Sequence, residues 1–263
     1  MSDPSVLINI EPSGRAIVSL NRPDVHNAFD DELIARLSED LKKLDQDPNV
    51  AVVVLAGEGK SFSAGADLNW MKRMADYTEA ENLADAEAVA GLLKALHDFS
   101  KPTVARVQGA AMGGGVGLVA CCDIAIASEA AKFSLSEVKL GLIPAMISPF
   151  VIAAIGERQS RRYMLSAERF SAWEAMRIGL VHGVVAAADL DQTVNDMTDT
   201  LLANGPKAMS EVKDLIGAIS GKPLDDDLAK ETAARIARVR VSDEGREGVT
   251  AFLEKRKPGW DKT

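Results

Sequence analysis

The segment from Gly109 to Gly117 is well suited to bind a negatively charged group through its backbone. Glycine stands at positions 109, 113, 114, 115 and 117. So many glycines are not expected inside a packed helix, because each loses backbone entropy on folding and offers no side chain to bury. We therefore expect a turn between a strand at 101–107 and a helix from Leu118, with free N–H groups and the helix dipole facing an anion. A tight turn that only brings strand and helix together is the alternative.

A second turn of small residues, Ser61 to Asp67, follows another predicted strand. It does not belong to a phosphate-binding loop, since Val54 stands where that loop needs its first glycine, and it contains no Gly-x-Ser-x-Gly nucleophile motif. Asp67 is placed to cap a helix over 68–74. Two such turns in one sheet could direct their N–H groups at one position.

Glu137 is a carboxylate in an otherwise apolar and small-residue segment. Such surroundings desolvate the carboxyl group and raise its pKa, which suits proton transfer near neutral pH. An ordinary acidic residue at a helix start is the alternative. The two cysteines, Cys121 and Cys122, are adjacent in an apolar segment, which predicts buried packing residues and neither a disulfide nor a metal site.

The elements that would position these residues alternate between strands and helices before they become mainly helical. A β-hairpin opens the chain, a helix capped by Asp30 or Asp31 follows, and the apolar run 51–56 reads as a strand buried on both faces of a parallel sheet. We expect an α/β core over 1–190 and a helical region over 191–263. The further expected elements are a helix at 79–99, strands at 123–127, 131–135 and 181–185, and helices at 150–155, 158–165, 172–178, 190–202, 206–219, 224–241 and 244–255.

The composition restricts the class of protein. Asp and Glu number 39 against 30 Lys and Arg, for a net charge of −9, which is unlike the basic surface that nucleic-acid binding requires. No apolar run approaches the ~20 residues of a membrane span, and the first residues do not resemble a signal peptide. We expect a cytoplasmic protein that binds neither nucleic acid nor membrane.

Motifs spread over nearly the whole chain resemble the enoyl-CoA hydratase/isomerase (crotonase) superfamily. They are 21–23 (NRP), 62–68 (FSAGADL), 101–102 (KP), 109–115 (GAAMGGG), 122–124 (CDI), 137–144 (EVKLGLIP), 175–181 (AMRIGLV) and 252–256 (FLEKR). Each motif is weak, but all occur in the order of the family. The resemblance implies a spiral of four ββα turns with a helical C-terminal trimerisation region.

The resemblance also implies an acyl-CoA site. The backbone N–H groups of Ala66 and Gly114 would form an oxyanion hole for the thioester oxygen. The CoA contacts would fall on Val25, Ala64 and Leu68, with Phe252 and Lys255 near the nucleotide end; a solvated helix-end charge is the alternative for Lys255. Coenzyme A would be part of the substrate, and no other cofactor is expected.

The catalytic carboxylates depart from the pattern of the family. Its hydratases commonly use two glutamates: Glu137 matches the second, but Gly117 stands where the first should be. Three functions stay open: addition of water to a 2-enoyl-CoA, double-bond isomerisation by Glu137 alone, and an inactive CoA-binding trimeric scaffold.

The segments 67–74, 115–119 and 142–150 look most like those of bacterial methylglutaconyl-CoA and isohexenylglutaconyl-CoA hydratases. Those substrates carry a second carboxylate, for which Lys72 or Arg73 is a candidate partner; exposed helix charges are the alternative for both.

A stripe on the predicted helix 224–241 points to self-association. Leu228, Thr232, Ile236 and Val239 line one face of a helix that follows the completed sheet. We expect a homotrimer, or a hexamer of two trimers, built through this region. Packing of the stripe within one subunit is the alternative.

Overall fold

The computed structural model describes residues 4–261 and contains two β-sheets. The larger sheet has the strand order β1-β2-β3-β5-β7-β10, and the smaller has β4-β6-β8-β9. The strands are β1 (Val6–Ile10), β2 (Arg15–Leu20), β3 (Val52–Gly57), β4 (Ser61–Ser63), β5 (Thr103–Val107), β6 (Ala110–Met112), β7 (Ile124–Ser128), β8 (Lys132–Ser134), β9 (Phe170–Ser171) and β10 (Gly183–Val185).

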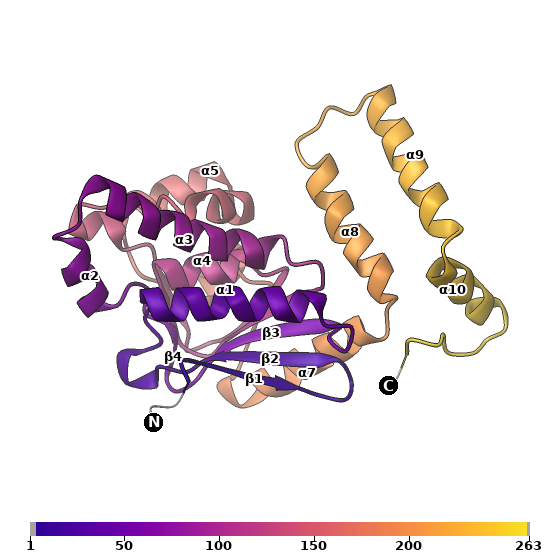
Figure 1. Cartoon of the computed structure of the whole chain (residues 1–263), viewed down its shortest axis with the longest axis horizontal. Coiled ribbons are helices and arrows are strands. Elements are labelled where there is room, and N and C mark those ends of the chain that lie inside the picture. The colour runs from indigo at the N-terminus through magenta and orange to yellow at the C-terminus, as the bar shows by residue number, and fades with distance from the viewer. Residues whose placement is uncertain (1–3, 262–263) are drawn as a thin grey trace.

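From β3 to β8, consecutive strands alternate between the two sheets. β3, β5 and β7 pair in parallel in the large sheet, while the strands that directly follow them, β4, β6 and β8, pair in parallel in the small one. Among the strands within residues 4–261, only the opening hairpin β1–β2 and the pair β8–β9 are antiparallel. Helices follow these strand pairs along the chain, so the fold is the expected α/β spiral of ββα units with a helical C-terminal region (Figure 1).

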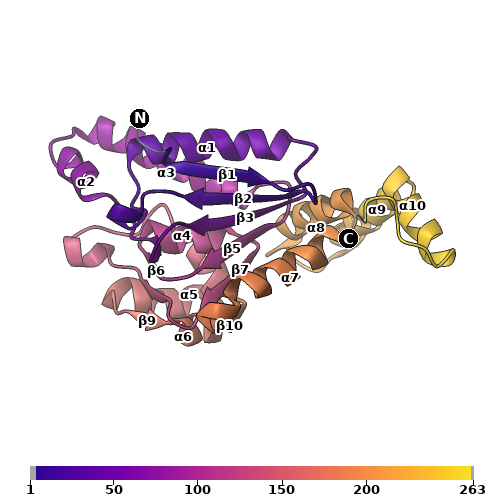
Figure 2. The ribbon, with the colours of Figure 1, turned by 90° about the horizontal axis from the view of Figure 1, so that it is seen from below.

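Helices cover both faces of the large sheet. α1 and α3 lie on one face and α7 on the other (Figures 1 and 2). On the α7 face, Leu190, Val194 and Leu202 pack against valines of β3 and β5. The helices are α1 (Asp31–Gln46), α2 (Leu68–Met74), α3 (Glu79–His97), α4 (Gly114–Cys121), α5 (Ser148–Ser166), α6 (Ala172–Arg177), α7 (Leu190–Leu202), α8 (Pro206–Ile219), α9 (Asp226–Arg240) and α10 (Asp243–Leu253), with short 3₁₀ turns at Pro23–Val25, Glu137–Leu140 and Ala187–Asp189.

The predicted helix starts at Asp30 and Asp67 are confirmed. The Asp30 carboxylate accepts a hydrogen bond from Leu33 N at 2.9 Å, and the Asp67 carboxylate accepts from Asn69 N and Trp70 N at 2.7 and 3.2 Å. Both acidic caps satisfy N–H groups that have no partner within the helix, and their charge complements the helix dipole. α1 and α2 therefore begin at fixed points in the chain.

The glycine segment was wrongly expected to lie outside a helix. α4 begins at Gly114 and contains Gly115 and Gly117, because it packs too closely on its neighbours for side chains there. A Cβ atom on Gly115 would lie 2.6 Å from Ser63 O, and one on Gly117 would lie 2.2 Å from Ile147 Cγ2. The absence of a Cβ atom at these glycines allows the close approach, at the cost of a lower helix propensity.

The two helices expected at 150–155 and 158–165 are confirmed as the two parts of α5, which a kink at Gly156 with φ +75° separates. The small sheet is a second difference from the expectation. Strands β4, β6 and β9 were not predicted, because two or three residues show no periodicity. The small sheet was therefore not visible in the sequence.

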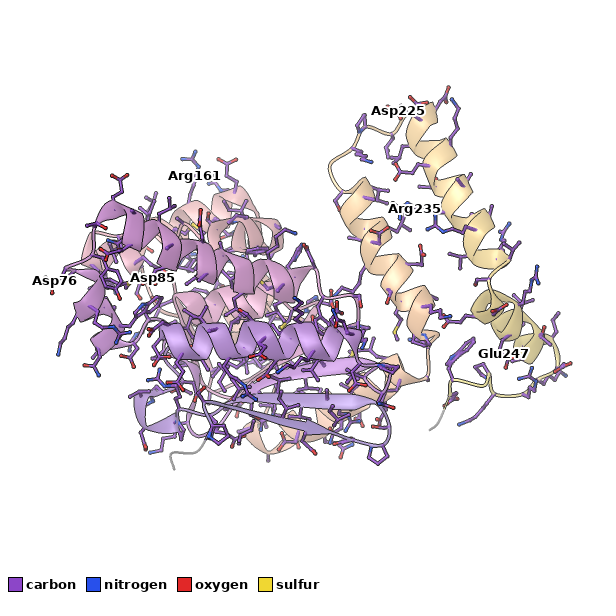
Figure 3. The ribbon with its side chains drawn as sticks, viewed as in Figure 1. Asp76, Asp85, Arg161, Asp225, Arg235 and Glu247 are labelled. Carbon is purple, nitrogen blue, oxygen red and sulfur yellow. The ribbon has the colours of Figure 1, made fainter. Side chains whose placement is uncertain are left out.

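The last three helices extend away from the sheets (Figure 1). α8 and α9 contain no buried residue, and α10 buries only Ala251. Ion pairs between Arg235 and Asp214 and between Arg238 and Glu211 hold α9 against α8 (Figure 3). The boundary near residue 190 stays a prediction. Among the described residues, no helix is long and apolar enough to cross a membrane.

Candidate active site

The turn after β4 leaves one backbone N–H group without a partner. Neighbouring N–H groups are bonded: Ala64 N donates to His26 O at 2.9 Å, and Asp67 N donates to Phe29 O at 2.7 Å. Gly65 N donates to Ser63 Oγ at 3.3 Å. Ala66 N has no acceptor within residues 4–261, and Ala66 is exposed. The turn therefore presents a rigidly held donor to solvent.

The turn after β6 presents a second donor. Gly113 N donates to Ser134 O at 2.9 Å, and Val116 N donates back to Gly113 O. Gly114 is the first residue of α4, where an N–H group has no acceptor within the helix, and no acceptor from the described part of the chain reaches it. The positive end of the α4 dipole lies at this nitrogen.

The two donors lie next to each other. A Cβ atom built on Gly65 would lie 3.6 Å from Gly114 N, which places the two turns in direct contact. Each donor follows a glycine with positive φ, +84° at Gly65 and +49° at Gly113, a conformation that other residues rarely adopt. The parallel pairing of β4 with β6 places both turns at the same end of the small sheet.

Glu137 places a carboxylate beside these donors. Its Oε1 lies 3.1 Å from the position of a Cβ atom on Gly113, the residue before the second donor. Its Oε2 is buried and has no hydrogen-bond partner among residues 4–261. Burial raises the pKa of the Glu137 carboxyl above its ordinary value, against a smaller opposing effect of a backbone hydrogen bond. The group is thus held ready to exchange protons with a molecule bound at the donors.

Position 117 is closed by an apolar side chain. Gly117 stands one helical turn after Gly113 and donates to Gly113 O at 3.3 Å. Ile147, which is 2 % exposed, covers the space that a side chain on Gly117 would need. Glu137 therefore has no carboxylate partner from this position of α4.

Arg22 joins the helix caps on either side of the first donor. Its Nη1 donates to Ala28 O at 2.6 Å, and its Nη2 lies 2.8 Å from Asp30 Oδ2 and 3.1 Å from Asp67 Oδ2. Burial alone would raise the pKa of Asp67, but the N–H groups of Asn69 and Trp70, together with Arg22, lower it below its ordinary value. The guanidinium therefore fixes the Ala66 turn between two anchored helix starts.

The expected CoA-binding residues fall into two separated groups. Val25, Ala64 and Leu68 are exposed. Ala64 and Leu68 flank the first donor along the chain, and the bond from Ala64 N to His26 O joins the loop of Val25 to that turn. Phe252 is 82 % exposed, and both it and Lys255 lie at α10, at the end of the molecule opposite α2 (Figures 1 and 2). One chain does not bring the two groups together.

The two basic residues considered for a substrate carboxylate both lie on the surface of α2. Arg73 is already paired with Asp31 at 2.5 Å, while Lys72 is exposed. α2 itself is held on α3 by a hydrogen bond of 2.9 Å from the Trp70 indole nitrogen to Asp85, which is labelled in Figure 3. No group of three metal-ligating side chains occurs within residues 4–261.

Arg22, Phe29 and Ile147 are contributors to the site that the sequence did not reveal. Phe29 forms a parallel bridge with Ala66, and its ring would lie 2.7 Å from a Cβ atom on Gly114, so it touches both turns. Each of the three residues contacts a partner far along the chain: Arg22 contacts Asp67, Phe29 contacts Gly114, and Ile147 lies beside Gly117. These partners are 30 to 85 positions away in the sequence. The available signal was the place of Arg22 in the motif 21–23 (NRP).

Comparison with known proteins finds sequences and structures that are similar over nearly the whole chain. The family model described as enoyl-CoA hydratase/isomerase matches residues 11–263. A solved enoyl-CoA hydratase from Shewanella pealeana is 46% identical with a TM-score of 0.94, and the match covers 97% of this chain and 96% of that one. A solved enoyl-CoA hydratase from Mycobacterium smegmatis is 30% identical with a TM-score of 0.92, covering 98% and 99% of the two chains. The short-chain-enoyl-CoA hydratase of Clostridium acetobutylicum is 32% identical over 94% of this chain and 95% of its own.

Replacement of Arg22 tests whether it positions the first donor. We expect Arg22→Ala to lower kcat on an acyl-CoA substrate by about tenfold or more, because displacement of one oxyanion donor weakens transition-state stabilisation more than binding. Steady-state kcat and a separately measured Kd for the acyl-CoA check this. The matched control is Arg36→Ala, which breaks the 2.6 Å pair with buried Asp40 on α1. Equal losses of kcat in both variants would reduce Arg22 to a stabilising residue.

Proposed function

Since the chain belongs to the enoyl-CoA hydratase/isomerase family, we propose that it adds water to a 2-enoyl-CoA thioester. The observation that carries this proposal is the meeting of two unpartnered N–H groups and one unpartnered carboxylate oxygen at a single place. Ala66 and Gly114 supply the donors and Glu137 the carboxylate. Relatives named for enoyl-CoA hydration support the choice of reaction.

The two donors would bind the thioester oxygen. When water attacks the β-carbon of the enoyl group, the carbonyl oxygen gains negative charge, and two fixed N–H groups stabilise the resulting enolate. Removal of one such donor typically costs about 3–4 kcal/mol of barrier. The turn backbones need no rearrangement for this, because the bonds of the neighbouring residues already hold them.

Glu137 would perform both proton transfers. Its carboxylate takes a proton from water as the oxygen bonds to the β-carbon, and it then returns that proton to the α-carbon of the enolate. Water is thereby added across the double bond and Glu137 ends in its starting state. The raised pKa of Glu137 helps the first transfer, because a carboxylate of higher pKa is the stronger base toward water.

Isomerisation is the second candidate, favoured by the absence of a carboxylate at Gly117. Glu137 would remove a proton from one carbon and deliver it to another, with no water involved.

A panel of crotonyl-CoA, methylglutaconyl-CoA and a 3-enoyl-CoA separates hydration, isomerisation and binding without turnover. Hydration adds the mass of one water, isomerisation changes the absorbance at constant mass, and binding of every thioester without turnover would indicate a scaffold. Among the possible 2-enoyl-CoA substrates, we propose a methylglutaconyl-type thioester.

The exposed apolar residues of the C-terminal helices support assembly of the chain into a trimer or a hexamer. Ile236 of the predicted stripe is 48% exposed, and Leu228, Thr232 and Val239 are only half-buried. Phe252 and Lys255, remote from Ala66 in one chain, would then reach an acyl-CoA bound by a neighbouring copy. Light scattering at micromolar concentration should give the mass of three or six chains, and the mass of one chain would contradict the proposal.

Glu137→Gln separates the catalytic role of this residue from its effect on stability. We expect kcat to fall by about 10²–10⁴-fold with little change in acyl-CoA affinity, since the amide cannot carry the proton. Full activity on the best substrate of the panel would remove Glu137 from the mechanism.

The same variant should be the more stable protein at neutral pH. Folding raises the pKa of the Glu137 carboxyl group, so the ionised carboxylate is less favourable in the native state than in the unfolded one. This destabilisation begins as the pH rises above the unfolded pKa of about 4.3 and is complete above the folded pKa. Melting curves should therefore show the advantage of Glu137→Gln growing with pH and vanishing below that window.

A further inference from the structure

Phe29 binds the turn after β4 through both of its backbone groups. Its N–H donates to Gly65 O at 2.6 Å, and its carbonyl oxygen accepts from Asp67 N at 2.7 Å, so that it bridges Ala66. The Gly65 carbonyl and the Ala66 N–H belong to one trans peptide group, in which they point in opposite directions. Because the carbonyl points at Phe29, the N–H of Ala66 points away from Phe29, where no acceptor within residues 4–261 reaches it.

The ring of Phe29 lies against the residue that carries the second donor. A Cβ atom on Gly114 would lie 2.7 Å from Phe29 Cε2 and 3.0 Å from Phe29 Cδ2. The ring thus occupies the side of Gly114 where other residues carry a side chain. Phe29 is 3% exposed and belongs to the close-packed core, so the ring has no free space to move into. One residue therefore contacts both turns, with its backbone on the first and its ring on the second.

The separation of the two donors decides whether both can act on one oxygen. Each N–H group must lie about 2.7–3.1 Å from the oxyanion. A misplacement of 1 Å can lower a rate by about 10²-fold. The backbone bonds of Phe29 prevent the first turn from rotating, and its ring limits how closely the first turn of α4 can approach. Both contacts exist before any substrate is bound.

We infer that Phe29 is the positioning residue of the donor pair: it directs Ala66 N–H into the site and holds Gly114 N at a fixed distance from it. This inference rests on the proposed function, and it applies to hydration and isomerisation alike because both pass through an enolate. Leucine at position 29 would keep the backbone bonds but leave a cavity beside Gly114. The first turn of α4 would then move relative to Ala66.

Phe29→Leu is compared with Phe99→Leu, which removes the same ring from the same core. Phe99 is 2% exposed and lies next to Ser100, whose N–H donates to Asp45 near the end of α1 (Figure 1). That end is about 20 Å from the start of α1, which directly follows Phe29. We expect Phe29→Leu to lower kcat about 10–100-fold with less than about threefold change in the Kd for butyryl-CoA, and Phe99→Leu to keep kcat.

The infrared carbonyl stretch of bound butyryl-CoA, labelled with ¹³C at the thioester carbon, adds a readout that a loss of stability does not move. Two donors lower this frequency, and we expect Phe29→Leu, but not Phe99→Leu, to return it toward the value of the free thioester. An unchanged frequency and kcat in Phe29→Leu would overturn the inference. A wild type that lowers the frequency but turns over no thioester of the panel would refute the proposed function and leave the positioning role standing.

Gly114→Ala tests the same contact with Phe29 in place, should Phe29→Leu fold poorly. The variant keeps the N–H group, but its methyl group meets the ring, so we expect kcat to fall by about tenfold or more and the carbonyl frequency to rise. The matched control is Gly91→Ala on α3, where an added Cβ atom has no neighbour within 4 Å. It should leave both quantities unchanged. Full kcat and an unchanged frequency in a folded Gly114→Ala protein would contradict the positioning role.

Discussion

The site depends on the contact between two turns whose backbones are held by the hydrogen bonds of their flanking residues. Gly65 and Gly113 adopt positive φ, and the position of a Cβ atom on the first lies 3.6 Å from Gly114 N. The small sheet creates this contact, because the parallel strands β4 and β6 end side by side. Hydrogen bonds satisfy the flanking N–H groups of Ala64, Asp67 and Gly113, so Ala66 and Gly114 are left as donors.

The fold holds the Glu137 carboxyl group in surroundings that disfavour its ionised form. Its Oε2 is buried without a partner, although a buried polar atom normally finds one. The cost of that burial is the raised pKa, and the benefit is a carboxyl group that can both accept and release a proton. Gly117 has no side chain, and buried Ile147 occupies the space that one would need, so no carboxylate from this position of α4 joins Glu137.

The sequence predicted the parts of this arrangement that depend on local chemistry. The caps at Asp30 and Asp67, the opening hairpin and the buried strand at 51–56 follow from patterns within a few residues. The motifs identified the family, and the spiral of ββα units was implied by that resemblance. The small sheet was missed because its strands are two or three residues long. The helical glycines of α4 were missed because close packing on Ser63 and Ile147 depends on residues far along the chain. The bridge that Arg22 forms between two helix caps was invisible for the same reason.

The central claim is that Ala66 N, Gly114 N and Glu137 act on one thioester, and a crystal structure with a saturated acyl-CoA, which cannot be hydrated, tests it most directly. The account predicts a thioester oxygen within about 2.7–3.1 Å of both nitrogens. It also predicts that the α-carbon lies within roughly 3–3.5 Å of a Glu137 carboxylate oxygen. A thioester oxygen bound by other groups, with both nitrogens still unpartnered and Glu137 remote from the α-carbon, would contradict the account.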